Sequence, residues 1–213
     1  GLVACVAVLL TAVQVARAQD VPTQVVRDGS IGPDRSVQPT PTPRPSGGAS
    51  YEIGEDLGVR PADGATLFHS FETFDVGSRD AVTFTTQVAT RTLIARVTGA
   101  VRSDILGSVS TSGPPFSTSA TELFFLNPAG ILFGRGSQLG RGFSFVASNA
   151  DELTFADGFI FRTSLEASAP ILTVGEVTDL SFASTATIRA EGGSAVFPAL
   201  ALIAGSAGTR VGV

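Results

Sequence analysis

Residues 123–134 read LFFLNPAGILFG, two short apolar segments joined by Asn127, Pro128, Ala129 and Gly130. In a type I turn, Asn at the first position bonds the backbone two residues on, and Pro at the second sets φ. Gly suits the fourth position, whereas Ala129 disfavours a type II turn, which needs positive φ at the third. We therefore predict two strands joined by a type I turn.

Short apolar segments of this kind continue on both sides of the turn. From Tyr51 onward they are separated by Gly, Asp, Ser and Thr, and no stretch sustains helical periodicity. The 24 glycines and 15 phenylalanines also favour many short strands over long helices. We predict strands at residues 105–109, 122–126, 131–133, 143–147, 153–155, 159–161 and 172–174.

The spacing of these segments indicates how they assemble. Ile105, Leu123, Phe143 and Phe161 are separated by 18, 20 and 18 residues, a rough repeat near the lower end of solenoid periods. In a parallel β-helix one repeat forms a coil that pairs its backbone with the coils on either side. We predict an all-β, parallel β-helical chain, and we expect its last residues to be followed by further coils.

The N-terminal residues have the pattern of a secretory leader. Residues 1–15 are almost wholly apolar, and a small-x-small cleavage pattern follows at Ala16, Ala18 and Gln19. We predict a signal peptide over residues 1–18, cleaved after Ala18. Because the sequence contains no methionine, we expect the positively charged start of this leader to be missing.

Charge and cysteine content exclude some partners and covalent links of the mature chain. All 14 basic residues are arginines, and removing the leader leaves 13 of them against 19 acids, which disfavours a nucleic-acid partner. The single cysteine, Cys5, lies in the leader, so the mature chain has no disulfide. Residues 2–5 also resemble a lipoprotein box, but the apolar run continues after Cys5, which argues against lipidation.

The residues between the leader and the main domain are predicted to cap it. Residues 23–26 and the turn at 28–31 favour an isolated strand or hairpin that docks on the main body. Alternating prolines in residues 37–50 favour an extended loop. We assign the cap to residues 19–50, the β-helical secretion domain to residues 51–182 and further coils to residues 183–213.

Taken in order, several motifs resemble the haemagglutination activity domain of two-partner-secretion exoproteins, the filamentous haemagglutinin type. The strand, Asn-Pro-x-Gly turn and Ile-x-Phe-Gly strand are the most specific of them. Ala129 stands where that family usually has Asn, and the proline run is a second departure. The other matching motifs are TLFHSFETFDVG at 66–77, RVTG at 96–99, SDILG at 103–107, GFSFVAS at 142–148 and FADG at 155–158.

The resemblance, which runs from about residue 28 to residue 182, implies a right-handed parallel β-helix with an N-terminal cap and short extra-helical strands. It implies export by the Sec machinery into the periplasm of a Gram-negative-type bacterium. An outer-membrane transporter barrel would then recognise the domain through its periplasmic domains and deliver it to the cell surface or medium. The missing C-terminal part would bind a host or cell-surface glycan or protein, as in an adhesin. The resemblance assigns secretion competence to Asn127, Pro128, Ala129 and Gly130.

Residue types suited to catalysis are sparse. The only histidine, His69, lies among phenylalanines and is expected to be structural, and the chain has no lysine. The glycine-rich residues 134–140 lack the spacing and the lysine of a nucleotide-binding loop. We therefore expect no enzymatic activity, no cofactor and no metal. Seven acids are candidates for a catalytic carboxylate by residue type alone, and most of them are expected to serve turns instead: Asp75, Asp80, Asp104, Glu122, Asp151, Glu152 and Asp157.

Two other functions remain open from the sequence alone. Some β-helical proteins are carbohydrate-active enzymes that place carboxylates on one face of a sheet. A one-chain autotransporter passenger would instead carry its own barrel at the C-terminus, visible as alternating amphipathic strands. Polysaccharide cleavage by the chain would indicate the first, and the full-length sequence would reveal the second.

Overall fold

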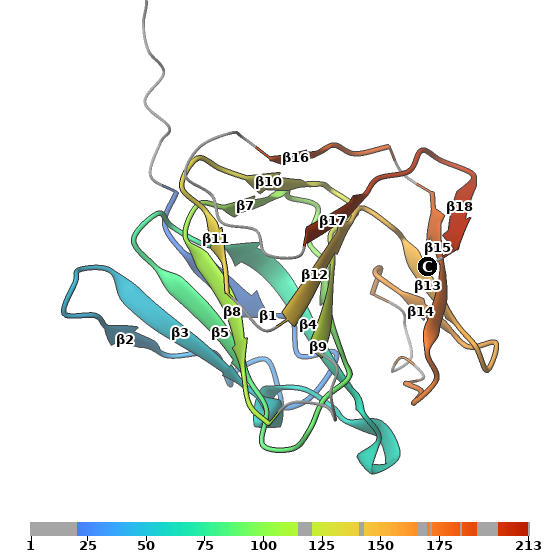
Figure 1. Cartoon of the computed structure of the whole chain (residues 1–213), viewed down its shortest axis with the longest axis horizontal. Coiled ribbons are helices and arrows are strands. Elements are labelled where there is room, and N and C mark those ends of the chain that lie inside the picture. The colour runs from blue at the N-terminus through green and yellow to red at the C-terminus, as the bar shows by residue number, and fades with distance from the viewer. Residues whose placement is uncertain are drawn as a thin grey trace, which may run out of the picture.

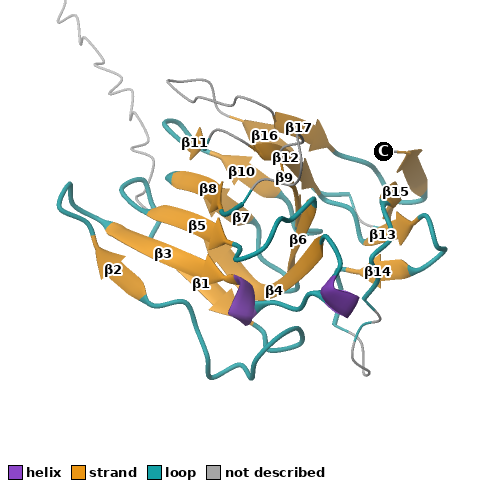
Figure 2. Ribbon diagram, turned by 60° about the horizontal axis from the view of Figure 1, so that its bottom comes forward, coloured by secondary structure: helices purple, strands orange, loops and turns teal. Residues whose placement is uncertain are grey.

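The structure, a computed structural model, describes residues 21–114, 121–140, 143–165, 170, 172–183, 185–190 and 200–212. Within these residues the fold is all-β, as predicted, apart from two single-turn 3-10 helices, η1 (Glu55–Leu57) and η2 (Pro61–Asp63) (Figure 2). No helix in the described ranges is long and apolar enough to cross a membrane. The predicted signal peptide, with its cleavage site at Ala16, Ala18 and Gln19, lies outside the described residues.

The chain passes repeatedly through three sheets, and we call one such pass a circuit (Figure 1). The first sheet contains β3 (Ala49–Gly54), β5 (Ala81–Thr85), β8 (Ser108–Ser112) and β11 (Gln138–Leu139). The second contains β4 (Thr66–Asp75), β6 (Thr92–Val97), β9 (Thr121–Leu126), β12 (Phe143–Ser148) and β17 (Leu200–Ile203). The third contains β7 (Ser103–Ile105), β10 (Ile131–Phe133) and β16 (Ile188–Ala190). All these strands pair in parallel.

Antiparallel strands are added at the N-terminal end and beside the second sheet. The strand β1 (Gln24–Arg27) pairs with β4, and β2 (Pro41–Pro43) pairs with β3. A separate antiparallel sheet, here called the docked sheet, contains β13 (Glu152–Phe155), β14 (Ile160–Arg162), β15 (Val177–Phe182) and β18 (Thr209–Gly212). In Figure 1 it lies next to β12 and β17, on the side of the molecule away from β2 and β3.

Four strands of the second sheet, β4, β6, β9 and β12, are covered on both faces. On its inner face Leu67, Leu93, Leu123 and Phe145 align from strand to strand and pack into a core shared with the first and third sheets. On its outer face Phe68, Ile94, Phe124 and Val146 align in the same way and pack against the docked sheet. Strands covered on both faces have consecutive buried residues rather than alternating ones, which is the pattern of β4, β6, β9 and β12.

The predicted repeat of 18 to 20 residues is wrong. Paired residues in the second sheet are about 22 to 30 positions apart, as the aligned Leu67, Leu93, Leu123 and Phe145 show. A full circuit, such as β5, β6 and β7, contains a strand from every sheet, so apolar segments of different sheets alternate along the chain. The four residues that suggested the shorter repeat lie in β7, β9, β12 and β14, which belong to three different sheets.

Three local predictions also need correction. Residues 105–109 form not one strand but the end of β7 and the start of β8, separated by a corner at which the Leu106 and Gly107 N–H groups both bond the Val76 carbonyl, at 2.8 and 3.1 Å. Residues 172–174 form no strand, because the Thr173 hydroxyl bonds the Asp157 carboxylate and accepts the Gly175 N–H. Residues 41–43 of the proline-rich loop form β2, an edge strand, where proline is tolerated.

Candidate functional site

The Asn127-Pro128-Ala129-Gly130 turn, here called the Asn127 corner, joins β9 of the second sheet to β10 of the third. The Gly130 N–H donates to the Asn127 carbonyl at 2.9 Å, and the Ala129 N–H donates to Asn127 Oδ1 at 2.9 Å. Among the described residues Ala62 is the one non-glycine with positive φ. Ala129 therefore has negative φ, which excludes a type II turn and agrees with the type I turn predicted.

The side chain of Asn127 connects neighbouring circuits. It is fully buried, and Nδ2 donates to the Val101 carbonyl at 3.0 Å and to Ser103 Oγ at 2.9 Å, both in the preceding circuit. Its backbone N–H donates to the Ser148 carbonyl of the following circuit at 2.9 Å. Since Oδ1 and the backbone carbonyl serve the turn itself, every polar atom of Asn127 is used.

Gly130 closes the corner against its neighbours. Its carbonyl accepts the Ser103 N–H at 3.1 Å, and the next residue, Ile131, donates its N–H to the Thr187 carbonyl at 3.2 Å. Gly130 has φ +106°, and a Cβ at this position would lie 2.7 Å from the Thr187 oxygen. Both the backbone conformation and the close approach therefore require glycine.

Asn149 occupies the corner equivalent to that of Asn127 one circuit later, a counterpart that the sequence reasoning missed. It follows β12 as Asn127 follows β9, because Ser148 pairs with Leu126 in the register of the two strands. Asn149 is also fully buried, and its amide exchanges two hydrogen bonds of 3.1 Å with the backbone of Gly205. The signal was present as an Asn directly after an apolar strand, but no proline or glycine turn follows it.

A buried polar cluster attaches the N-terminal residues to the second sheet. The Asp28 carboxylate accepts the Ser30 N–H at 2.8 Å. It also accepts the hydroxyls of Ser30, Ser70 and Thr98, at 2.7, 2.6 and 2.9 Å. Burial raises the pKa of Asp28, but the hydrogen bonds from Ser70, Ser30 and Thr98 outweigh burial and lower the pKa below its ordinary value. Asp28 therefore stays ionised and fixes the start of the described chain onto β4.

Arg96 extends this cluster to the docked sheet. Its buried guanidinium donates to Ser70 Oγ at 2.8 Å and to Ser30 Oγ at 2.9 Å. It also donates to the carbonyls of Arg162 and Ser164 and lies 4.9 Å from the centre of the Phe161 ring. One side chain of β6 thus contacts both the N-terminal residues and the docked sheet.

Arg27 holds the loop that follows β1. The side chain is 1% exposed, and burial lowers its pKa from the ordinary value. Its guanidinium makes no ion pair in the described part of the chain and is satisfied by backbone carbonyls instead. These carbonyls belong to Ile31 (2.7 Å), Pro33 (2.9 Å), Asp34 (3.4 Å), Val37 (2.7 Å) and Leu57 (3.1 Å).

His69 lies in the inner core rather than in a site. It is 1% exposed, its ring is 5.5 Å from that of Phe84, and neither ring nitrogen meets a hydrogen-bond partner among the described residues. Burial is the main cause that lowers the pKa of His69 to about 3; the charge of Arg27 acts in the same direction, and the Leu57 backbone and the Glu55 charge oppose it. A neutral, enclosed imidazole of this kind supports the structural role expected for it.

The acids considered as candidates serve backbone groups and arginines rather than converging. Asp75 accepts the Asp104 N–H at 2.8 Å, and burial raises the pKa of Asp75 and of Glu122. No group of three His, Cys, Asp or Glu side chains within the described ranges could hold a metal ion. The other partners are Ala49 N–H for Asp80, Arg102 for Asp104, Ala183 N–H for Asp151, Arg162 for Glu152 and Phe159 N–H for Asp157.

Comparison with known proteins identifies the family. A family model described as the TPS secretion domain matches residues 45–207, a range that contains the Asn127 corner, Asn149 and Arg96. A search of curated proteins found no match. The family match confirms the resemblance to the haemagglutination activity domain of two-partner-secretion exoproteins. Because it covers most of the 213 residues, this chain belongs to the TPS (two-partner secretion) secretion domain family.

Proposed function

We propose that this chain is the N-terminal secretion domain of a large exoprotein, and that an outer-membrane transporter barrel recognises it through periplasmic domains. The observation that carries the proposal is the family match over residues 45–207. In this proposal residues 1–18 direct the chain through the Sec machinery into the periplasm, and the barrel delivers it to the cell surface or the medium. The domain acts by folding and being recognised rather than by catalysis, and the cargo is an adhesin that binds a glycan or protein through later residues.

The proposal includes a right-handed parallel β-helix as the fold. It is supported by three parallel sheets entered in a constant order and by the alignment of Leu67, Leu93 and Leu123 on successive strands. In this fold residues 19–50 are the N-terminal cap, residues 51–182 form the main domain and residues 183–213 contribute further coils. The parallel pairing of β16 with β10 and of β17 with β12 supports the last of these assignments.

In this proposal Asn127, Pro128, Ala129 and Gly130 give the domain its secretion competence. A chain that emerges from a transporter must begin to fold before its later parts arrive, so an early, well-defined circuit is an advantage. The corner supplies one, because it bonds the Val101 and Ser103 region before it and the Ser148 backbone after it. Since Ala129 contributes only its N–H to the turn, the geometry tolerates the loss of the family's usual asparagine.

Transporter dependence tests the function. The chain with its natural continuation is expressed in cells that contain or lack the partner barrel, and surface and secreted protein are quantified by immunoblotting. We expect both to fall to background without the barrel, while the periplasmic pool persists or is degraded. Normal surface delivery in the strain without the barrel would contradict the proposal.

Asn127→Ala tests the role of the corner, with Asn149→Ala as a matched control one circuit later. The first change leaves the buried Ser103 hydroxyl and Ala129 N–H without their partners, whereas the second removes bonds to Gly205. We expect secretion to fall at least tenfold for Asn127→Ala and less for Asn149→Ala, as measured by secreted protein per cell. Equal secretion of Asn127→Ala and the unaltered protein would remove the corner from the proposal.

A further inference from the structure

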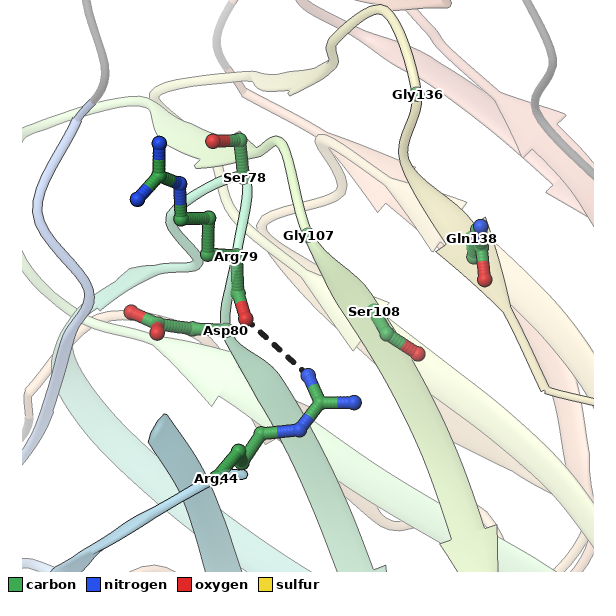
Figure 3. Close-up of a pocket in the computed structure, with 8 residues that line it drawn as sticks. All are labelled: Arg44, Ser78, Arg79, Asp80, Gly107, Ser108, Gly136 and Gln138. Atoms are coloured by element: carbon green, nitrogen blue, oxygen red, sulfur yellow. Dashed lines mark hydrogen bonds between the residues drawn. The ribbon is translucent and has the colours of Figure 1, made fainter. Parts of the chain in front are cut away.

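A polar pocket opens where the proline-rich hairpin meets the corners that precede the first sheet (Figure 3). Its volume is about 220 Å³. The corners of three successive circuits contribute to it, together with one side chain from the turn between β2 and β3. The residues around it are Arg44, Ser78, Arg79, Asp80, Gly107, Ser108, Gly136 and Gln138.

The hairpin between β2 and β3 places Arg44 in this pocket. The Arg44 N–H donates to the Gly48 carbonyl and the Arg44 carbonyl accepts the Gly47 N–H, both at 3.0 Å, so the backbone of Arg44 is held at both ends of the turn. Arg44 Nη1 donates to the Arg79 carbonyl at 3.1 Å. A Cβ on Gly48 would collide with the same carbonyl, so the hairpin can approach the corner only because glycine occupies this position.

Two arginines that line this pocket have no carboxylate partner among the described residues, but only the Arg44 guanidinium extends toward β8, whereas the Arg79 side chain points away from it (Figure 3). Neither Arg44 nor Arg79 forms an ion pair within the described part of the chain, and Arg79 is exposed. The carboxylate of Asp80 accepts the Ala49 N–H at 2.7 Å and the Thr23 hydroxyl. In Figure 3 it points away from β8, toward which the Arg44 guanidinium extends. The negative charge of Asp80 is therefore directed at the hairpin backbone rather than at the opening.

The opposite wall is neutral and can both donate and accept. Ser108 begins β8 and Gln138 begins β11, and the two residues pair in the register of these strands, so they lie side by side. Neither side chain makes a hydrogen bond within the described ranges. A second pocket of about 370 Å³ adjoins the first through Ser78, Arg79 and Asp80, and Val21 and Pro22 give it an apolar side.

We propose that these two pockets bind an acidic sugar, a hexose ring with one carboxylate, as part of an anionic polysaccharide. Guanidinium groups bind carboxylates with paired, charge-assisted hydrogen bonds, which assigns Arg44 to the carboxylate. The exposed Arg79 side chain would turn toward the pocket to join it. The hydroxyl of Ser108 and the amide of Gln138 match the sugar hydroxyls, which also donate and accept. The apolar side formed by Val21 and Pro22 takes the C–H face of the adjoining sugar ring. This site is separate from secretion and gives the domain a binding activity of its own.

Titration with glucuronic acid, glucose and sodium sulfate, followed by protein NMR, tests the proposal. We expect glucuronic acid to shift signals of Ser108 and Gln138 and to bind at least tenfold more tightly than glucose, because glucose lacks the charged group. We expect sulfate to bind more weakly than glucuronic acid, because it lacks the ring. Equal binding of glucose would overturn the role of the arginines, and equal binding of sulfate would reduce the site to a general anion site and overturn the sugar assignment.

Arg44→Gln and Arg79→Gln identify the site, with Arg210→Gln as the control. Arg210 lies on β18 of the docked sheet, is exposed, and its bond to Ser181 Oγ is long at 3.3 Å, so its replacement makes the same charge change elsewhere. We expect roughly tenfold weaker glucuronic acid binding in each pocket variant and unchanged binding in the control. Arg79→Gln is informative even if Arg44→Gln disturbs the hairpin. If Arg79→Gln bound glucuronic acid as tightly as the control, the proposal would be overturned. Secretion of all three variants is measured as well, so that a loss of sugar binding can be distinguished from a loss of secretion.

Discussion

Single buried polar residues are accommodated in different ways in this protein. Asn127 uses every polar atom in hydrogen bonds, and Arg27 directs its charge at backbone carbonyls. His69 is equally buried but has partners for neither ring nitrogen among the described residues. A histidine in that position stays neutral, because the cost of burying its charge outweighs what the Leu57 backbone and the Glu55 carboxylate offer. Protonation of His69 should therefore be the main reason why mild acid destabilises the folded protein.

We predict that the free energy of unfolding falls between about pH 7 and about pH 5. The pKa of His69 is about 3 in the folded protein and 6.5 in a free histidine, so within this window the unfolded chain binds a proton that the folded chain refuses. The loss should reach about 2 kcal/mol at pH 5. Urea unfolding at a series of pH values measures it.

His69→Phe is the control for this slope. Phenylalanine cannot titrate, and the neighbouring Phe71 and Phe84 rings form an apolar surrounding for it. Because His69 is the only histidine in the chain, the difference in slope between the two proteins belongs to this residue. An unchanged slope in His69→Phe would show that other groups cause the acid sensitivity.

Corners, rather than strands, set the arrangement of the elements. The strands of the three parallel sheets are short, and β7 and β10 have only three residues each, so their paths depend on where each corner ends. At the Asn127 corner this end point is fixed by Gly130, whose carbonyl accepts the Ser103 N–H of β7 and whose positive φ lets the next residue, Ile131, donate to the Thr187 carbonyl. A substitution that disturbs this corner should therefore destabilise the whole third sheet.

Gly130→Ala and Gly158→Ala separate crowding from backbone strain. Both glycines have positive φ, +106° and +83°, so alanine costs about 1 kcal/mol of strain in either. A Cβ at Gly158 meets nothing within 4 Å, whereas one at Gly130 meets the Thr187 oxygen at 2.7 Å. A buried clash costs about 2 kcal/mol, so we expect Gly130→Ala to lower the free energy of unfolding by about that much more than Gly158→Ala does. Equal urea midpoints would show that the Thr187 contact is relaxed at little cost.

The sequence specified the elements to different degrees. The Asn127 corner was predictable because Asn, Pro and Gly each act on their own backbone, so the turn needs no knowledge of neighbours. Asn149 and Arg27 were not, since their partners are carbonyls and amides that become close only in the folded chain. The predicted repeat of 18 to 20 residues was wrong because residues such as Ile105 and Leu123 belong to different sheets, and the hydrophobicity of a segment does not show to which sheet it belongs.

At the scale of the whole molecule, the second sheet is shared by two cores. Its inner face closes the three-sheet core and its outer face receives the docked sheet, so the two parts are stabilised through the same strands. The sequence predicted strands at 153–155 and 159–161 but not that they form an antiparallel sheet against the second sheet, because alternation does not identify the pairing partner. Arg96 is the polar connection between the two parts.

We predict that Arg96→Gln loosens the docked sheet and the N-terminal residues that Arg96 bonds through Ser30 and Ser70, but not the inner core. The variant loses the contact with Phe161 and the bonds to the carbonyls of Arg162 and Ser164, while the inner core is untouched. Amide hydrogen exchange in β13, β14 and β15 should accelerate roughly tenfold or more, with little change in β5 and β8.

Arg91→Gln is the matched control for this prediction. Arg91 pairs with Glu176 near the start of β15, but the two side chains are 48% and 71% exposed. Exposed ion pairs contribute little to stability, so exchange in β13 to β15 should stay close to that of the unaltered protein. If Arg91→Gln and Arg96→Gln accelerated exchange equally, burial of Arg96 would not be the cause.

The docked sheet begins after β12, yet the chain later returns to pair β16 with β10 and β17 with β12 in parallel. An excursion of several strands thus interrupts the parallel sheets without shifting their register. Such a molecule can acquire or exchange whole segments at its corners while the rest keeps its shape. The tip between β13 and β14, where a Cβ on Gly158 would meet no atom within 4 Å, is accordingly a position at which a foreign epitope could be displayed on an exported carrier.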